Sequence, residues 1–453
     1  MPSLWFDTAL LAEGWAKDVR LTVDGGRIRA IATGVPAREG DARHGIAVPG
    51  LCNVHSHAFQ RGMAGLTEFR GVSDDDFWTW RELMYRFLDR IDPDDVEAIA
   101  AQAYVEMLEG GFTRVGEFHY LHHDPAGNAY ADLAETAQRI VAAADLTGIG
   151  LTLLPVFYAH ATFGGAPAAP GQRRFLNDID RFAALMQASA SAIAPLPDAN
   201  LGVAPHSLRA VTPEELDSVI GLTPLGPIHI HAAEQVKEVD DCLAWSGQRP
   251  VAWLLDHAAV DPRWCLVHAT HLGDGEVMGL AASGATAGLC PITEANLGDG
   301  VFAADAYLRA GGAFGIGSDS NILIDPGQEL RALEYGQRLS RRARNVLGSA
   351  DRPSVGATLF AGALSGGARA LGQAPGGLAV GATADIVGLD PDNTSLYGRS
   401  GDRLLDGWLF AGSGGVVKTV WRRGECVVEG GRHHAADAVG RRYRHTLDKL
   451  LRQ

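Results

Sequence analysis

The middle of this 453-residue chain alternates short apolar runs with stretches of helical periodicity, and this alternation restricts its fold more than any other feature. Repeated strand and helix units are typical of parallel sheets, in which each helix connects one strand to the next. The candidate strands are GIAVPGLCNV (45–54), FTRVGEF (112–118), GLTLLPVF (150–157), NLGVAP (200–205), PIHIHAAE (227–234), WCLVHAT (264–270), ATAGLCPI (285–292) and GAFGIGSDS (312–320). Eight such units predict an α/β fold, a (β/α)8 TIM-like barrel.

The two ends of the chain have a different pattern. VRLTVDGGRIRAIAT (19–33) places strand-like alternation on both sides of an Asp-Gly-Gly turn. LAVGATADIVGLDPDN (378–393) and VVKTVWRRGECVVEGGR (416–432) are similarly rich in β-branched residues and punctuated by glycine. We therefore expect residues 1–48 and 376–453 to form a small composite β-sandwich domain with a C-terminal tail. Residues 49–375 would form the barrel.

Charge and cysteine usage exclude several classes of function. The chain has 54 acidic and 39 basic residues, a net charge of −15, which argues against a nucleic-acid partner. No run approaches the roughly 20 apolar residues of a membrane helix, and the N-terminus does not resemble a secretory signal. The five cysteines are scattered and form no C-x-x-C pair, as expected of free thiols in a reducing compartment. We expect a cytoplasmic protein without a membrane partner.

Histidines and carboxylates follow the candidate strands repeatedly. In a (β/α)8 barrel the C-terminal ends of the strands form the functional face. One or two such residues would be ordinary loop residues, but that explanation does not account for the whole set. The set comprises His55, His57, Glu117, His119, His206, His229, His231, Glu234, His268 and Asp319. Structural roles are the favoured interpretation for Glu117 and His119, and the neighbouring His122 and His123 are interpreted as loop residues.

Four of these residues suit an open metal site. His55 and His57 are two positions apart, so that in a strand both imidazoles point to the same face. A metal ion that activates water needs neutral imidazoles, a carboxylate and a free coordination position. We propose His55, His57, His231 and Asp319 as the ligands, with Zn²⁺ as the expected ion and Fe²⁺ or another divalent ion as alternatives. His229 lies one step deeper in its strand, and we expect it to lie behind the ligands.

Five sequence blocks, in this order, resemble the amidohydrolase superfamily in its single-metal branch of deaminases and chlorohydrolases. They are PGLCNVHSH (49–57), HIHAAE (229–234), LVHAT (266–270), GIGSDSN (315–321) and GGLAVGATADIVGLD (376–390). The resemblance implies a barrel with a flanking β-sandwich, one zinc ion per chain and a homodimer. It also implies that Glu234 carries protons to the leaving nitrogen, that His268 helps to activate water, and that Asp319 accepts the water's proton. No lysine follows the fourth strand, so the bridging lysine of two-metal relatives is not expected.

Further stretches resemble the members of this family that hydrolyse N-formimino-L-glutamate to N-formyl-L-glutamate and ammonia in histidine degradation. They are FQRGMAGLTE (59–68), FWTWRELMYRF (77–87), VGEFHYLHHDPAGN (115–128), LLPVFYAHATFGGAPAAPGQRRF (153–175) and PHSLRAV (205–211). A small dicarboxylate substrate needs fixed cationic groups, and Arg81 and Arg209 are the proposed ones. The resemblance implies that Gln60 and Tyr120 complete the carboxylate contacts, and that His206 lies with Glu234 nearer the formimino group.

Alternatives remain open for each assignment. Arg81 and Arg209 could be solvated residues of packing elements, and Arg173 or Arg174 could bind the carboxylates instead, carried by loop 162–175 as a lid over the barrel mouth. Another deaminase of the branch would act on guanine, an adenosine derivative or a triazine, with a neutral pocket. A noncatalytic barrel would have lost Glu234, His268 or a ligand, and none is missing from the sequence.

Overall fold

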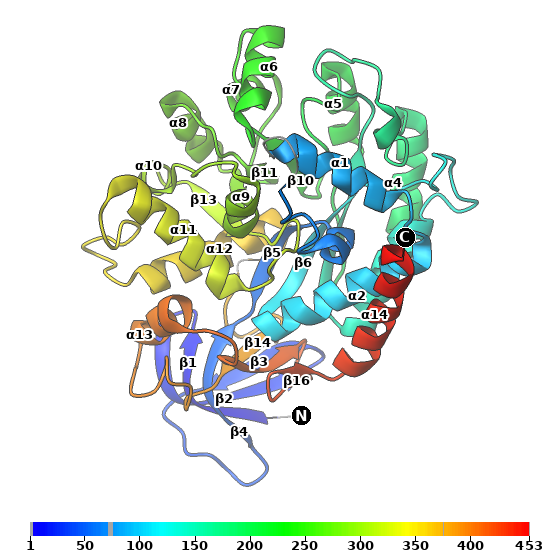
Figure 1. The fold of residues 1–453 in the computed structure, drawn as a ribbon. Helices are drawn as coiled ribbons and strands as arrows, with labels where there is room; N and C mark the ends of the chain where they lie inside the picture. Colours follow the sequence, from blue (N-terminus) through cyan, green and yellow to red (C-terminus); the bar gives the residue numbers. More distant parts are fainter. Residues whose placement is uncertain (1–2, 71–75, 375, 453) are drawn as a thin grey trace.

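The chain forms two sheets, one from its ends and one from its middle, in a computed structural model that describes residues 3–70, 76–374 and 376–452 (Figure 1). The terminal sheet has the strand order β17-β16-β15-β14-β4-β1-β2-β3. Its strands are β1 (Ser3–Leu11), β2 (Gly14–Asp24), β3 (Arg27–Ala32), β4 (Ala42–Pro49), β14 (Ile386–Leu389), β15 (Val417–Arg422), β16 (Glu425–Glu429) and β17 (Arg432–His433). It has its own apolar core, in which Phe6, Leu21 and Trp421 are buried.

The sheet of the middle segment is parallel throughout and contains all eight predicted strands. They are β5 (Leu51–Ser56), β6 (Phe112–His119), β7 (Gly150–Phe157), β8 (Asn200–Leu201) with β9 (Ala204–Pro205), β10 (Ile228–Ala232), β11 (Trp264–His268), β12 (Thr286–Leu289) and β13 (Ala313–Ile316). The barrel closes where Val203 pairs with Ile228 and Ser207 with His231. The predicted α/β barrel with a separate β domain is confirmed.

Two of the predicted strands differ from the observed ones. The fourth is interrupted at Gly202, where a Cβ atom would lie 2.6 Å from the carbonyl oxygen of Pro227. The first predicted run contains the end of β4 and most of β5, and the chain passes from one sheet to the other at Gly50. A Cβ atom at Gly50 would lie 2.3 Å from the side chain of Thr113, so only glycine fits this crossing.

Helices connect the barrel strands and surround them (Figure 1). They are α1 (Phe77–Leu88), α2 (Pro93–Gly110), α3 (Glu135–Thr147), α4 (Ile179–Ile193), α5 (Pro213–Gly221), α6 (Val236–Ser246), α7 (Pro250–His257), α8 (Asp274–Ser283), α9 (Pro291–Leu297), α10 (Ala304–Arg309), α11 (Pro326–Arg341) and α12 (Val355–Ala370). Short helical turns η1 (Ala58–Met63) and η2 (Pro170–Gln172) lie in the loops after β5 and β7.

The terminal segment adds α13 (Asp402–Asp406), the π-helical turn η3 (Gly407–Ala411) and α14 (Ala436–Leu451), which packs along α2 (Figure 1). A buried ion network joins the terminal sheet to the barrel: Arg422 Nη2 lies 2.5 Å from Asp198 Oδ2, and its Nη1 lies 2.5 Å from Asp385 Oδ1. Arg114 of β6 contacts the same Asp198 oxygen at 2.7 Å. The domain limits at residues 48 and 376 remain a prediction, and residues 1–2, 375 and 453 of these segments lie outside the described residues.

Within the described residues, no helix is both long enough and apolar enough to cross a membrane.

Candidate metal centre and active site

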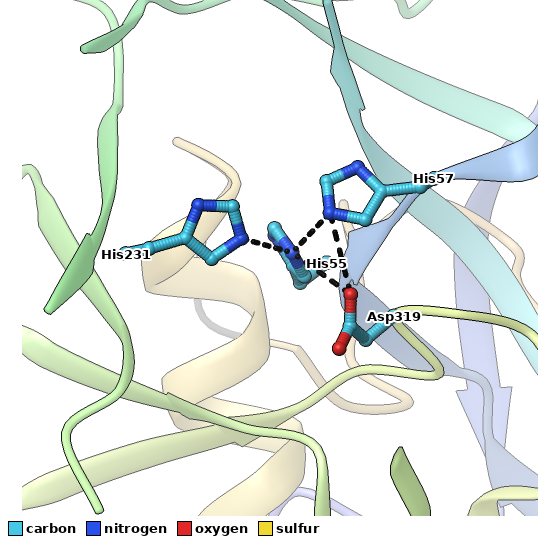
Figure 2. Close-up of side chains that lie close together, drawn as sticks. All are labelled: His55, His57, His231 and Asp319. Atoms are coloured by element: carbon cyan, nitrogen blue, oxygen red, sulfur yellow. Dashed lines mark hydrogen bonds and ion pairs between the residues drawn. The ribbon is translucent and has the colours of Figure 1, made fainter. Parts of the chain in front are cut away.

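Three imidazoles and one carboxylate converge where β5, β10 and β13 end (Figure 2). The Nε2 atom of His55 lies 3.2 Å from Nε2 of His57 and 3.1 Å from Nε2 of His231. The Oδ1 atom of Asp319 lies 3.4 Å from His55 Nε2 and 3.3 Å from His57 Nε2. All four side chains are buried. The barrel thus brings the four proposed ligands together at one point.

Backbone contacts orient two of these imidazoles. His57 Nδ1 lies 3.0 Å from the carbonyl oxygen of Phe118, and His231 Nδ1 lies 3.0 Å from that of His206. Because a carbonyl oxygen only accepts, both rings donate from Nδ1 and keep a lone pair on Nε2. Burial lowers the pKa of both imidazoles and keeps them neutral. Neutral imidazoles with converging lone pairs fit a divalent ion.

The backbone around Asp319 is held in an uncommon conformation. Its φ angle is +43°, in the left-handed region that non-glycine residues rarely adopt. The Asp319 N–H donates to the His55 carbonyl oxygen at 2.9 Å, and the His57 N–H donates to the Asp319 carbonyl oxygen at 2.9 Å. The Asn321 amide donates to the carbonyl oxygens of His57 and Asp319, both at 3.1 Å. These bonds lock the loop after β13 to the end of β5, so that the ligands of both strands share one frame.

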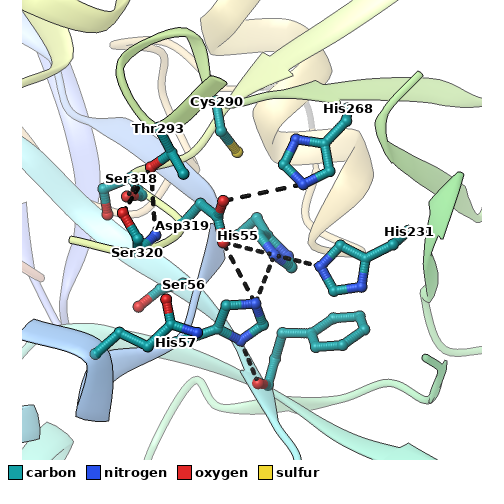
Figure 3. A network of polar contacts seen from close by, with 12 residues as sticks. His55, Ser56, His57, His231, His268, Cys290, Thr293, Ser318, Asp319 and Ser320 are labelled. Carbon is teal, nitrogen blue, oxygen red and sulfur yellow. Dashed lines mark hydrogen bonds and ion pairs between the residues drawn. The ribbon is translucent and has the colours of Figure 1, made fainter. Parts of the chain in front are cut away.

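His268, at the end of β11, lies among carboxylates beside the ligand cluster. Its Nε2 atom is 3.9 Å from Asp319 Oδ2 (Figure 3) and 3.7 Å from Glu234 Oε1. Its Nδ1 atom is 3.3 Å from Glu294 Oε1. Burial opposes the charged imidazolium, but Glu234, Glu294 and Asp319 outweigh it and raise the pKa of His268 to about 10. The arrangement can hold and pass a proton between His268 and its carboxylate neighbours.

Glu234 follows β10 in a sharp turn and is the second group placed to move a proton. Burial raises its pKa to about 7, while His268 and Arg209 limit the rise. The turn depends on Glu238, whose carboxylate accepts the backbone N–H groups of Ala233 and Glu234, each at 3.1 Å. Ala233 has a φ angle of +53°, which explains why the turn needs this support.

A pocket opens over the ligand cluster. The proposed substrate residues Gln60, Arg81, Tyr120, His206 and Arg209 line it, as do Glu234, His268 and Asp319. The remaining lining residues are mostly apolar or aromatic: Phe77, Trp80, Met84, Tyr85, Tyr158, Phe175 and Leu297, with the ligands His57 and His231. The pocket therefore combines an apolar wall with a few convergent polar groups.

Arg209 is a buried cation inside this pocket. Its Nη2 atom lies 3.7 Å from Glu234 Oε2 and 3.9 Å from Glu238 Oε2. Its Nε atom is buried and has no hydrogen-bond partner in the part of the chain that the structure describes. A guanidinium stays charged at all accessible pH values, and an unsatisfied buried donor is costly unless a ligand completes it. Arg209 is thus available to a carboxylate that enters the pocket.

Helix α1 covers one side of the pocket and supplies Arg81. The Arg81 guanidinium lies 4.4 Å from the ring centre of Trp78, and its Nε atom is buried and has no hydrogen-bond partner in residues 3–70, 76–374 and 376–452. Gln60 donates its amide to the hydroxyl of Tyr120 at 3.0 Å, and its own Oε1 atom is buried without a partner. The sequence analysis left open that α1 is only a packing helix, but residues of α1 also line the pocket.

Arg173 and Arg174, the alternative carboxylate-binding residues, do not line the pocket. Arg173 pairs with Asp89 at 2.5 Å and is half-buried. Arg174 is buried and donates to the carbonyl oxygens of His123, Leu88 and Ile91. The loop that carries them contributes Phe175 to the pocket wall.

The other strand-end residues have structural partners. His229 Nε2 lies 2.7 Å from the carbonyl oxygen of Ala370, behind the ligands, and His119 Nε2 lies 3.0 Å from Thr136 Oγ1. Glu117 accepts the N–H of Ala58 at 2.7 Å and so holds the start of η1. His122 and His123 lie in a loop, but both are buried, with their Nε2 atoms on carbonyl oxygens of the loop and of β7.

Sequence reasoning missed several residues that support the site. Glu238 and Asn321 make hydrogen bonds to the backbone near the site, and Glu294 contacts the Nδ1 atom of the His268 ring. Asp299 is a buried carboxyl near Glu234. Asn321 stood within the family block GIGSDSN, which was the one available signal. The others lie three or more residues from any strand end and carry no motif.

Comparison with known proteins places this site in a family. Residues 46–427 match the family model described as Amidohydrolase family, and residues 4–45 match the Formimidoylglutamate deiminase HutF, N-terminal domain. The chain belongs to the amidohydrolase family. A Pseudomonas aeruginosa protein named formimidoylglutamate deiminase is 52% identical over 100% of both chains. A Natronomonas pharaonis 5-methylthioadenosine/S-adenosylhomocysteine deaminase is 28% identical over 91% of this chain and 88% of the relative.

Solved structures of other amidohydrolases have the same fold. The crystal structure of an amidohydrolase from Brucella melitensis matches with a TM-score of 0.97 and 56% identity over 100% of both chains. An adenosine deaminase from Xanthomonas campestris with bound zinc matches with a TM-score of 0.80 and 24% identity, over 99% of this chain and 98% of that one. At that identity the second likeness shows the fold alone.

Removal of a divalent ion from this amidohydrolase by a chelator is expected to abolish activity and lower Tm, since the ion binds only the folded ligand cluster. Two histidines of β10 give a matched pair. His231→Ala should lose the ion, because it removes a converging lone pair, whereas His229→Ala should retain it. Metal analysis and thermal unfolding of both variants test this assignment. Equal metal loss from the two variants would contradict it.

Proposed function

We propose that the protein is a formimidoylglutamate deiminase, which hydrolyses N-formimino-L-glutamate to N-formyl-L-glutamate and ammonia in histidine degradation. The observation that carries the proposal is the buried guanidinium of Arg209 in the same pocket as the metal ligands and Glu234. Beyond its contacts with Glu234 and Glu238, the Arg209 guanidinium keeps a buried Nε donor that has no partner among the described residues and that a substrate carboxylate would satisfy. The full-length relative of that name supports the same reaction.

Zinc is the ion that we propose, one per chain, held by His55, His57, His231 and Asp319. Three imidazoles and one carboxylate are suitable zinc donors, and Fe²⁺ shares these ligands. When bound, such an ion lowers the pKa of a water molecule from 15.7 towards about 7 and polarises the formimino carbon.

The protein's own residues manage the protons. Asp319 Oδ2 takes the proton that the attacking water gives up, and the positively charged His268, whose Nε2 atom lies 3.9 Å from that oxygen, stabilises the negative charge that develops on the attacked centre. Glu234 Oε1, 3.7 Å from His268 Nε2, delivers a proton to the departing nitrogen. A carbon–oxygen bond forms, the bond from that carbon to the imino nitrogen breaks, and this nitrogen leaves as ammonia with both protons of the water molecule. Glu294 holds His268 in place throughout through its contact with Nδ1.

The substrate's two carboxylates determine its orientation. Arg209 and Arg81 bind them, with Gln60 and Tyr120 supplying further polar contacts, while His206 lies with Glu234 near the formimino group. The unpartnered Nε atoms of both arginines and the unpartnered Oε1 atom of Gln60 support these roles. The homodimer and the cytoplasmic location stay predictions.

A competing reaction is the deamination of a purine or triazine by the same metal apparatus. We do not favour it, because two arginines in the pocket suit carboxylates better than a neutral ring. A noncatalytic barrel is disfavoured because Glu234, His268 and the proposed ligands are all placed for chemistry.

The direct test is ammonia release by enzyme that carries one zinc ion per chain. N-formimino-L-glutamate, guanine and adenosine are compared side by side. We expect release from the formimino substrate alone. Release only from a purine would keep the metal mechanism and overturn the carboxylate contacts, and release from none would overturn the proposal.

A further inference from the structure

A second group of metal donors lies beside the first. One donor atom from each of His268, Cys290 and Asp319 lies within 4.8 Å of the others, and all three residues are buried. Figure 3 shows the sulfur of Cys290 directed towards the space between the side chains of His268 and Asp319. The reaction described above gives no role to Cys290. The sulfur therefore needs an explanation of its own.

Cys290 is held firmly but its sulfur is free. It follows β12 at the start of α9, and its N–H donates to Glu294 Oε1 at 2.9 Å. The same Glu294 oxygen lies 3.3 Å from His268 Nδ1, so one carboxylate positions both residues. The Sγ atom is fully buried and makes no hydrogen bond to any described residue. An unpartnered thiol is thus aimed at an imidazole nitrogen and a carboxylate oxygen.

Asp319 can serve both groups because its two oxygens face different ways. Its Oδ1 atom lies 3.4 Å from His55 Nε2 and 3.3 Å from His57 Nε2, whereas its Oδ2 atom faces His268 Nε2 at 3.9 Å. A carboxylate of this kind can bridge two ions. One thiolate and one shared carboxylate would also offset the charge of a second divalent ion.

We propose that His268 Nε2, Cys290 Sγ and Asp319 Oδ2 form a second, inhibitory site for thiophilic divalent ions such as Cd²⁺ and excess Zn²⁺. Thiolate and imidazole donors select these ions over Mg²⁺ or Ca²⁺. Binding displaces one proton from the thiol and, where it is present, one from His268 Nε2, and both leave to water. The ion then occupies Asp319 Oδ2, which receives the water's proton, and His268 Nε2, so turnover stops.

The test uses zinc-loaded full-length enzyme titrated with Cd²⁺ in the absence of substrate. We expect one Cd²⁺ per chain in addition to the resident zinc, measured by equilibrium dialysis and metal analysis. A thiolate-to-cadmium charge-transfer absorption in the ultraviolet should accompany it, since the first site contains no sulfur. Activity should fall in parallel and return when a chelator removes the Cd²⁺.

Cys290→Ser removes the soft donor and keeps the size of the side chain. We expect it to retain basal activity, to lose the absorption band, and to need at least about tenfold more Cd²⁺ for half-inhibition. Cys265→Ser is the matched control, because Cys265 is an equally buried thiol on the neighbouring β11 that lies outside the donor group. It should keep both the band and the inhibition. Cys290→Ala provides the same test if the serine variant does not fold.

The proposal is overturned if no Cd²⁺ binds beyond the resident ion, or if Cys290→Ser keeps the band and the original sensitivity. Because binding and absorption are measured without substrate, these outcomes are independent of which substrate the enzyme hydrolyses.

Discussion

Glu234→Gln is expected to lower kcat by about 10²- to 10⁴-fold while the protein folds and binds its metal normally. Glutamine has nearly the same shape and can still lie near Arg209, but it cannot carry a proton to the departing nitrogen. The carboxyl of Glu234 also lies 3.7 Å from His268 Nε2, so its loss removes a negative charge that stabilises the charged imidazole of His268. Steady-state ammonia release measures kcat, and metal analysis measures the bound ion.

His268→Asn gives the companion measurement. It too should lose turnover and keep the metal, because His268 lies outside the cluster of three imidazoles and Asp319. The ligand variant His231→Ala supplies the opposite pattern, loss of metal together with activity. If Glu234→Gln and His268→Asn lost zinc as readily as the ligand variant, the separation between metal ligands and proton-carrying residues would be wrong.

Arg209→Ala is expected to reduce kcat/KM for N-formimino-L-glutamate by about 10²- to 10³-fold, mostly through KM. The guanidinium is the buried cation available to a substrate carboxylate, and its removal also leaves Glu234 and Glu238 without their shared counter-charge. The second effect should destabilise the fold, so thermal unfolding has to be measured together with the kinetics. Arg209→Lys keeps the positive charge but not the paired N–H donors. Its kcat/KM should therefore lie between those of the wild type and Arg209→Ala.

Arg173→Ala is the matched control for the arginine variants. Arg173 is bound to Asp89 and to backbone carbonyl groups outside the pocket, so its loss should leave KM unchanged. A formimino substrate with only one carboxylate separates the two pocket arginines further. If replacement of one of these arginines by alanine no longer changes kcat/KM for that substrate, that arginine contacts the carboxylate that the substrate lacks. An unchanged kcat/KM for Arg209→Ala would contradict its assignment to the substrate.

The sequence predicted the barrel because alternation between strands and helices has a strong signature at every repeat. It also predicted that the proposed metal ligands would lie close together, because residues at the C-terminal ends of parallel strands lie on one face. His231 was chosen over His229 as the proposed ligand, and the contact of His229 Nε2 with the Ala370 carbonyl oxygen is compatible with that prediction.

What the sequence could not supply was the set of contacts that hold these residues in place. Glu238 supports a turn, Glu294 holds a ring and a backbone N–H, and Asn321 ties two loops together. Such roles depend on three-dimensional neighbours separated by up to 265 residues, as for Asn321 and Ser56. The crossing at Gly50 could not be predicted either, because nothing in an apolar run indicates that its two halves belong to different sheets.

The left-handed backbone of two functional residues has a consequence for how this fold can change. Asp319 and His268 have φ angles of +43° and +68°, conformations that cost about 1–3 kcal/mol each outside glycine. Glycine at either position would relieve that strain and also remove a buried ionisable group. A screen that rewarded thermal resistance alone would therefore select against the active site. A barrel of this fold can therefore become catalytically inactive through mutations that raise its stability as well as through mutations that lower it.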